Sequence, residues 1–204
     1  MSKKPIIVFE GIEGSGKSHH ILNVSSYLKK KKIDHIKIRE PGGNINSEKI
    51  RKLILNNNTD FNKITDLFLY MASRSENVNI IKKSLNKRII LIDRFIDSTI
   101  AYQHYGMGVD LNLIKFLNRS LLDNIRPTFT FLNIVNRKNL ISRLKKRKRL
   151  NRYDRFNMTF YNRVQKGYLN IAKQKKSSYK IIDSNNDIKT NEYFVLDKID
   201  KLIK

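Results

Sequence analysis

The sequence predicts an α/β fold in which a five-stranded parallel sheet carries helices on both faces. Five apolar runs of strand length alternate with segments of helical periodicity. Strands separated by helices are typical of βαβ crossovers, which join parallel strands. The 204 residues are 40% hydrophobic, enough to close one core, and no repeat or linker interrupts them. We therefore expect residues 1–204 to form a single domain.

The first predicted strand covers residues 5–10, because this is a short apolar run, and a glycine-rich turn and a helix to about residue 31 follow it. The core is expected to include three apolar residues of this region, Ile12, Ile21 and Leu22. The other strands are expected at 33–39, 88–93, 128–134 and 179–183, and helical patterns cover about 46–56 and 60–83.

Three of these strands are followed by residues suited to ligand binding. The glycine-rich turn follows the first strand, Arg39 to Gly43 follow the second, and Asp93 and Arg94 end the third. Because ligands of open parallel sheets bind at the carboxyl ends of the strands, we expect these segments to form one site.

The turn after the first strand matches G-x-x-x-x-G-K-[ST], the pattern of a phosphate-binding loop. It consists of Gly11, Ile12, Glu13, Gly14, Ser15, Gly16, Lys17 and Ser18. Since the loop connects a strand to a helix, its N–H groups and the helix dipole can bind phosphate oxygens. Lys17 is expected to bridge the β- and γ-phosphates of a nucleotide, and Ser18 to bind Mg²⁺. This pattern favours the P-loop NTPase fold.

Asp93 and Arg94 are expected to act beside this loop. A carboxylate in this place commonly holds Mg²⁺ through water, and an arginine can clamp a phosphate with two hydrogen bonds. A strand-end ion pair is the structural alternative, but the position beside the nucleotide loop favours function. The four histidines, by contrast, show no metal-ligand spacing: His19, His20, His35 and His104.

The chain is strongly basic, with 42 Lys and Arg against 18 Asp and Glu and a formal net charge of +24. This suggests polyanions or phosphate-bearing small molecules as partners. Residues 137–176 alone hold 15 basic residues and one acid. The absence of cysteine excludes thiolate catalysis and Cys-ligated metals. No apolar run suits a membrane span or a signal peptide, so we expect a cytoplasmic protein.

Six short segments occur in an order and spacing that together are quite specific. They are the phosphate loop, REPGG at 39–43, YMASR at 70–74, DRF at 93–95, STIAYQ at 98–103 and FYNRVQKGY at 160–168. In these segments, which span about the whole chain, the sequence resembles the bacterial-type thymidylate kinases. The resemblance implies a nucleoside-monophosphate-kinase-like fold with a mobile basic lid at about 137–156. It also implies that the γ-phosphoryl group of MgATP is transferred to dTMP, giving dTDP and ADP. A homodimer is implied, with no specific nucleic acid or membrane partner.

The resemblance further implies a dTMP site. Its residues are Glu13, Arg39, Pro41, Tyr70, Arg74, Arg94, Ser98, Thr99, Tyr102 and Gln103, with Arg51 as a further candidate. Glu13 would receive the sugar 3′-hydroxyl, and Arg94 would clamp the phosphate. Tyr70 and Arg74 lie four residues apart on a helix and so share a face. The resemblance implies that Tyr70 stacks on thymine and that Arg74 bonds its edge. Core packing is an alternative for Tyr70. Tyr102 is the candidate for crowding the sugar C2′ position.

By the same resemblance, the lid would supply the catalytic arginine, because Ser15 leaves the phosphate loop without one. Its arginines are Arg143, expected at the ATP phosphates, and Arg147, Arg149 and Arg152. The expected catalytic set is Lys17, Arg94, Arg147 and Arg152. The family often has D-R-[IY]-E where this chain has N-R-Y-D at 151–154, so the choice among lid arginines stays open. Most of Lys145, Lys146 and Lys148 are expected to be solvated, and Phe95 replaces a frequent Tyr or His.

The residues leave two other functions open. Another small P-loop kinase would turn over deoxythymidine or UMP better than dTMP. A nucleic-acid-binding ATPase would use the charge of +24, and would show salt-dependent binding and stimulated ATP hydrolysis. The lack of interleaved basic and aromatic residues argues against this second function.

Overall fold

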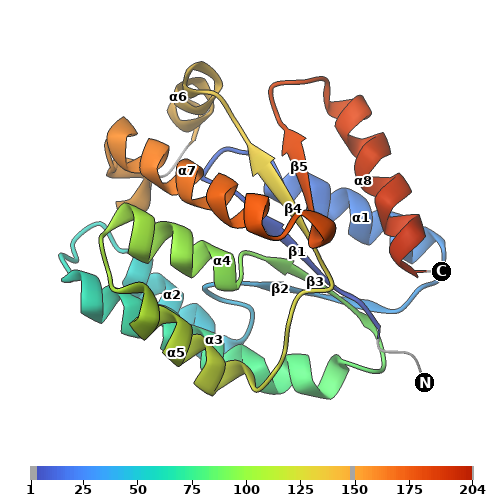
Figure 1. Cartoon of the computed structure of the whole chain (residues 1–204), viewed down its shortest axis with the longest axis horizontal. Coiled ribbons are helices and arrows are strands. Elements are labelled where there is room, and N and C mark those ends of the chain that lie inside the picture. The colour runs from blue at the N-terminus through green and yellow to red at the C-terminus, as the bar shows by residue number, and fades with distance from the viewer. Residues whose placement is uncertain (1–3, 148–149, 204) are drawn as a thin grey trace.

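The computed structural model describes residues 4–147 and 150–203 and shows a five-stranded, fully parallel sheet (Figure 1). The strands are β1 (Ile6–Glu10), β2 (His35–Arg39), β3 (Ile89–Asp93), β4 (Phe129–Ile134) and β5 (Tyr179–Asp183). Their order across the sheet is β2-β3-β1-β4-β5. The predicted α/β fold with five parallel strands is therefore confirmed.

The helices between the strands are α1 (Lys17–Lys30), α2 (Ile45–Leu55), α3 (Lys63–Ser84), α4 (Ile96–Thr99), the π-helix η1 (Ile100–Gly106), α5 (Leu111–Leu122), α6 (Arg137–Lys145), the 3₁₀-helix η2 (Arg152–Arg155), α7 (Met158–Gln174), the 3₁₀-helix η3 (Lys176–Ser178) and α8 (Ile188–Ile203). Asparagine side chains cap several of them: Asn44 begins α2 and Asn62 begins α3 by accepting backbone N–H bonds. Within the described residues, no helix is long and apolar enough to cross a membrane.

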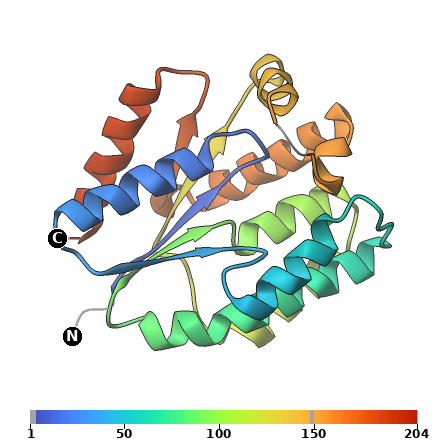
Figure 2. The ribbon, with the colours of Figure 1, turned by 180° about the vertical axis from the view of Figure 1, so that it is seen from behind.

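The core lies on both faces of the sheet, because successive strand residues point to opposite sides. On one face, Ile7 and Phe9 of β1 pack with residues of α1 and α8. On the other, Ile6 and Val8 pack with residues of α3 and α5. Figure 2 shows α1 and α8 side by side on the first face. Helices on both faces leave the carboxyl ends of the strands open for a site.

One core prediction is wrong: Leu22 is 57% exposed, whereas Ile12 and Ile21 are buried. The buried positions of α1 are Lys17, His20, Ile21, Val24 and Leu28. They recur every three to four residues and so form one stripe of the helix. Leu22 follows Ile21 by one residue, which turns it about 100° away from that stripe.

Candidate active site

A cavity of about 740 Å³ opens at the carboxyl ends of the strands, between the phosphate loop, α3, η1 and the lid. Most of the residues predicted from the sequence line it: Glu13, Gly14, Gly16, Lys17, Ser18, Arg39, Pro41, Arg51, Tyr70, Asp93, Arg94, Ser98, Tyr102, Gln103, Arg143 and Arg147. Gly11, Ile12, Ser15, Arg74, Thr99 and Arg152 lie outside this lining. Several segments distant in the sequence thus meet in one cavity.

The phosphate loop begins at a glycine for a steric reason. Gly11 has a φ of 137°, and a Cβ atom there would lie 2.2 Å from the carbonyl oxygen of Asn133. The Lys17 ammonium lies across the loop, donating to the carbonyl oxygens of Gly11 at 2.7 Å and Ile12 at 2.8 Å. Burial, and then repulsion by Arg94, lowers the pKa of Lys17 to about 7. The lysine therefore lies where an added negative charge would strongly favour its protonated form.

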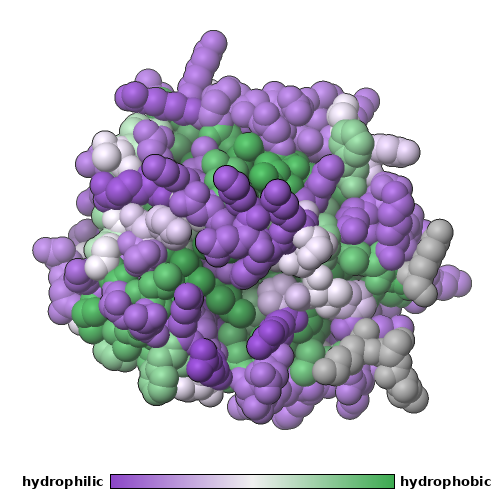
Figure 3. All heavy atoms as spheres, in the orientation of Figure 1, coloured by the Kyte–Doolittle hydropathy of each residue, from purple (hydrophilic) through white to green (hydrophobic). Residues whose placement is uncertain are grey.

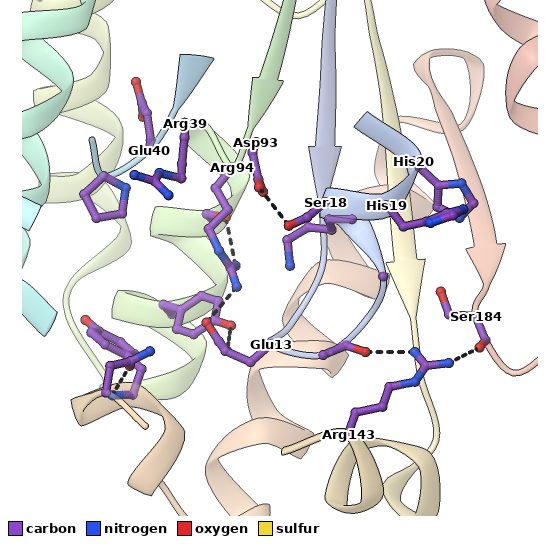
Figure 4. Close-up of a pocket in the computed structure, with 18 of the residues that line it drawn as sticks. Glu13, Ser18, His19, His20, Arg39, Glu40, Asp93, Arg94, Arg143 and Ser184 are labelled. Carbon is purple, nitrogen blue, oxygen red and sulfur yellow. Dashed lines mark hydrogen bonds and ion pairs between the residues drawn. The ribbon is translucent and has the colours of Figure 1, made fainter. Parts of the chain in front are cut away.

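A candidate metal position lies beside Lys17. The Ser18 hydroxyl, in the first turn of α1, lies 3.5 Å from Oδ2 of Asp93 at the end of β3 (Figure 4). The described residues contain no group of three or more His, Cys, Asp or Glu that could hold a metal ion. Mg²⁺ prefers oxygen ligands and is usually held by one or two protein groups plus phosphates and water. The Ser18 and Asp93 pair fits that arrangement.

Arg143 connects the phosphate loop to the residue that follows β5. From α6, its guanidinium donates to the Gly14 carbonyl at 2.8 Å and to the Ser184 carbonyl at 2.7 Å (Figure 4). Ser184 follows β5 and donates its hydroxyl to the Ser15 carbonyl at 2.6 Å. The first helix of the basic segment is thereby joined to the phosphate loop, with a cation at the cavity wall.

Arg94 lies at the centre of the end of the cavity opposite Arg143. Its backbone has a φ of 66°, which residues with a Cβ rarely adopt. Its guanidinium donates to Glu13 Oε1 at 2.7 Å and to the Gly11 carbonyl at 2.9 Å, and lies 5.0 Å from the Tyr102 ring centroid. Burial disfavours the charged form of Glu13, but Arg94, Lys17 and the Tyr102 hydroxyl together lower the pKa of this carboxyl. Glu13 is thus held as a carboxylate beside Arg94.

Two more arginines reach the cavity, Arg39 from the end of β2 and Arg51 from α2. Arg39 donates to Glu48 at 2.7 Å, and Arg51 donates to the Pro41 carbonyl at 2.7 Å. Both line the cavity together with Pro41. The REPGG segment and α2 therefore form a basic wall near Arg94.

Tyr70 and Arg74 have different environments, although they lie one helical turn apart. Tyr70 lines the cavity, with its ring edge-on to Tyr153 at 6.0 Å. Arg74 is 2% exposed, and its three nitrogens donate to Glu40, Asn118 and the Phe95 carbonyl. These partners hold Arg74 in the protein interior, and its expected bond to the edge of a base stays a prediction.

The STIAYQ segment forms α4 and the π-helix η1, a geometry that the sequence pattern did not indicate. Ser98, Tyr102 and Gln103 line the cavity, whereas Thr99 is buried outside it. The Tyr102 hydroxyl bonds Glu13. The Ser98 hydroxyl is already bonded to Glu10 at 2.5 Å and to Tyr168 at 2.7 Å. Tyr102 and Gln103 are therefore the members of this segment best placed for ligand contact.

The lid arginines separate into two environments. Arg147 lines the cavity and pairs with Asp154. Arg152 turns away, pairing with Asp66 of α3 and donating to the Ile54 carbonyl at 3.1 Å. Its predicted catalytic position is therefore not observed, because the Asp66 carboxylate holds it. Arg149 and Lys148 lie outside the described residues, and Lys145 and Lys146 are exposed, as expected.

The departure from D-R-[IY]-E in the lid has a local explanation. Asn151 accepts backbone bonds from Tyr153 and Asp154, and Asp154 accepts one from the Asn151 N–H, a reciprocal capping box for η2. Asparagine can perform the capping that an aspartate would perform. The short turn can therefore form with the sequence of this chain.

Sequence reasoning missed four polar residues around the site: Glu10, Glu40, Asp66 and Tyr168. All four are buried, and each bonds a predicted site residue. A carboxylate that closes an otherwise apolar strand was a visible signal for Glu10, since a buried carboxylate needs partners. Glu40 and Tyr168 lie in the segments REPGG and FYNRVQKGY, but no role was predicted for them, and the position of Asp66 gave no comparable signal.

The cavity therefore has two cationic ends joined by one loop, an arrangement suited to two phosphate-bearing ligands. Residues 9–195 match the family model described as thymidylate kinase. The chain is 40% identical over 184 residues to the thymidylate kinase of Thermosipho africanus, covering 89% of this chain and 90% of that protein. It is 36% identical over 196 residues to the thymidylate kinase of Sulfurihydrogenibium sp., covering 95% of each. The crystal structure of thymidylate kinase from Ehrlichia chaffeensis matches with a TM-score of 0.80 and 33% identity, covering 98% of this chain and 99% of that one.

Proposed function

The chain belongs to the thymidylate kinase family, and we propose that its cavity aligns MgATP at the phosphate loop with dTMP at Arg94. The family is one of phosphotransferases, whose substrates are ATP and dTMP. The reaction transfers the γ-phosphoryl group of ATP to dTMP and yields ADP and dTDP. The roles of individual residues that follow are part of the proposal.

One observation carries the assignment of the two ends. The Lys17 ammonium and the Arg94 guanidinium both donate to the carbonyl oxygen of Gly11, at 2.7 Å and 2.9 Å. One cation from the start of α1 and one that follows β3 thus converge on one atom. Phosphates bound to each cation would be adjacent, which is the geometry that phosphoryl transfer requires.

The chemistry needs charge neutralisation more than proton transfer. A phosphate monoester has a second pKa of about 6, so the acceptor is mostly a dianion at neutral pH and needs no general base. Two such anions repel each other, and Lys17, Arg94 and Arg147 would offset that repulsion. Mg²⁺ bound with ATP near Ser18 and Asp93 would neutralise further phosphate charge.

Sugar and base recognition would come from the groups beside Arg94. Glu13 would accept a hydrogen bond from the 3′-hydroxyl, Tyr102 would crowd C2′, and Tyr70 would face the thymine ring. Gln103 lines the cavity, and its Oε1 is buried without a hydrogen-bond partner among the described residues. This oxygen is free to accept an N–H from the base.

The deciding experiment is a coupled assay of ADP release with dTMP, dUMP, dCMP, AMP, GMP, UMP and thymidine as acceptors. We expect the highest kcat/KM with dTMP. Absence of turnover with dTMP would refute the proposal. Faster turnover of thymidine or UMP would instead support another small P-loop kinase.

We also propose that the chain forms the homodimer that the family resemblance implies, and that the second copy packs against α3 and α5. Ile64 and Phe68 of α3 and Phe116 of α5 are exposed, and Figure 3 shows hydrophobic atoms gathered at the lower left, the region of α5. Light scattering should give the mass of a dimer for the native chain. Phe116→Glu should shift it to a monomer, whereas Leu22→Glu, at another exposed position, should not.

The charge and the lack of cysteine complete the proposal. Some of the basic residues behind the excess charge of +24 would bind the phosphates of the small ligands. The others would lie on the surface without a specific nucleic acid partner. A chain without cysteine is compatible with a reducing compartment, and we propose the cytoplasm.

A further inference from the structure

The buried carboxylate of Glu10 contacts the turn that follows Arg94. Glu10 ends β1, is fully buried and has four donors around its carboxylate. They are the N–H groups of Phe95 at 2.9 Å and Ser98 at 3.2 Å, and the hydroxyls of Ser98 at 2.5 Å and Tyr168 at 3.1 Å. Three of the four belong to the turn that follows Arg94. Because burial of a charge is costly without such bonds, this turn and Glu10 stabilise each other.

The bonds to Glu10 explain how Arg94 keeps an uncommon backbone conformation. A φ of 66° costs a residue with a Cβ free energy, so the surrounding contacts must hold it in place. Glu10 fixes the backbone immediately after Arg94 through Phe95 and Ser98. The bonds to Glu10 therefore fix the direction in which the Arg94 side chain leaves the backbone.

Tyr168 extends the same contact to the guanidinium. This residue of α7 is fully buried, and its hydroxyl lies 3.2 Å from Nη1 of Arg94, 2.7 Å from the Ser98 hydroxyl and 3.1 Å from Glu10. The arginine can only donate, so the Tyr168 oxygen accepts its bond, while the Tyr168 proton goes to Glu10 or Ser98. One hydroxyl thus joins the cation to the buried carboxylate.

We propose that Glu10 and Tyr168 are positioning residues for Arg94, which hold its guanidinium in the orientation that binds the acceptor phosphate. Neither residue lines the cavity, so their effect is indirect. The inference rests on the proposed role of Arg94 in binding the dTMP phosphate. It predicts a loss of affinity that depends on the phosphate group and not on the nucleoside.

The test compares dissociation constants of dTMP and thymidine, measured by calorimetry or competition, in Tyr168→Phe, Glu10→Gln and Arg94→Ala. Tyr168→Phe removes the hydroxyl that bonds both Arg94 and Glu10, so dTMP binding should weaken about tenfold. Thymidine binding and KM for ATP should stay unchanged. Glu10→Gln should show the same selective loss of dTMP affinity. This second variant keeps the test decisive if Tyr168→Phe does not fold. The matched control is Tyr27→Phe, which removes a hydroxyl bonded to Asp200, between α1 and α8; its dTMP affinity should be that of the native chain.

Each outcome decides between the two claims. If Arg94→Ala weakens dTMP selectively but Tyr168→Phe and Glu10→Gln do not, the positioning role is wrong and the proposed function stands. If the two variants weaken dTMP and thymidine equally, their role is merely structural. If Arg94→Ala leaves the ratio of the two constants unchanged, the phosphate clamp itself fails.

Discussion

The proposed ATP end and the proposed dTMP end of the cavity are built in different ways. At the ATP end, Lys17 bonds carbonyl groups only five and six residues before it. At the proposed dTMP end, Arg94 bonds partners that lie 74, 81 and 83 residues away, in addition to Ser98 four residues further along the chain. The Lys17 contacts are local, whereas most of the Arg94 contacts are assembled by the folded sheet and helices. Local contacts need little loop closure, but distant ones depend on the whole fold.

This contrast predicts where changes will act. A substitution of Lys17 in the phosphate loop should affect ATP directly, with little influence on the acceptor. A substitution among the partners of Arg94 should be transmitted through several elements.

Lys17→Ala should have the largest effect. The ammonium would contact the transferring phosphate, and loss of such a preorganised charge commonly costs about 10²–10³ in kcat. Steady-state kinetics should show this loss while thymidine affinity remains native. A variant that retained more than about a tenth of kcat would contradict the assignment of Lys17 to the reacting phosphates.

Arg94→Ala should follow closely, with kcat/KM for dTMP lower by about 10², since a bidentate bond to a phosphate is lost. KM for ATP should change little. Because Glu13 would then be buried without its cation, some loss of thermal stability is also expected. Equal changes in both KM values would show that the two ends are not separable.

Arg147→Ala and Arg152→Ala distinguish the lid arginines. Arg147 lines the cavity, and its loss should lower kcat by at least about tenfold, as expected for a cation near the transferring group. Arg152 pairs with Asp66, so its loss should mainly lower thermal stability. A larger fall in kcat for Arg152→Ala would mean that this residue leaves Asp66 during the reaction.

His20 should make stability depend on pH at the ATP end. Burial, and then the neighbouring His19, lowers the pKa of this α1 residue to about 4. Below pH 6.5 His20 becomes protonated in the unfolded chain but stays neutral in the folded chain. The free energy of unfolding therefore falls as pH decreases toward 4. The loss between pH 6.5 and 5 should be about 2 kcal/mol. Denaturant titrations should show a smaller loss in His20→Gln; an equal loss would contradict this pKa.

Lys145→Ala should have the smallest effect. Lys145 ends α6, is exposed and has no ion pair among the described residues. Its kcat/KM should remain within about twofold of the native value, as for most exposed substitutions. Damage comparable to that of Lys17→Ala would show that the lysines of the lid also meet ATP.

Much of the fold could be predicted from the sequence because its signals are local. The five strands were found from their apolar runs, and the loop at 11–18 was found from glycine and lysine spacing. The family was also visible in short motifs, and the family match confirms it. The π-helix η1 was not predicted, since its sequence has no distinct periodicity.

Tertiary structure alone decided which polar side chains face the ligands. Arg74 and Arg147 are the same residue type, yet Glu40 and Asn118 hold the first in the protein interior while the second reaches the cavity. Glu10 and Tyr168 lie 158 residues apart in the sequence, yet the Tyr168 hydroxyl donates to the Glu10 carboxylate beside Arg94. A sequence motif states which groups are present, but the partners that compete for each group come from other elements. Only when the chain is folded do hydrogen bonds and burial determine which arginines remain free to bind phosphate.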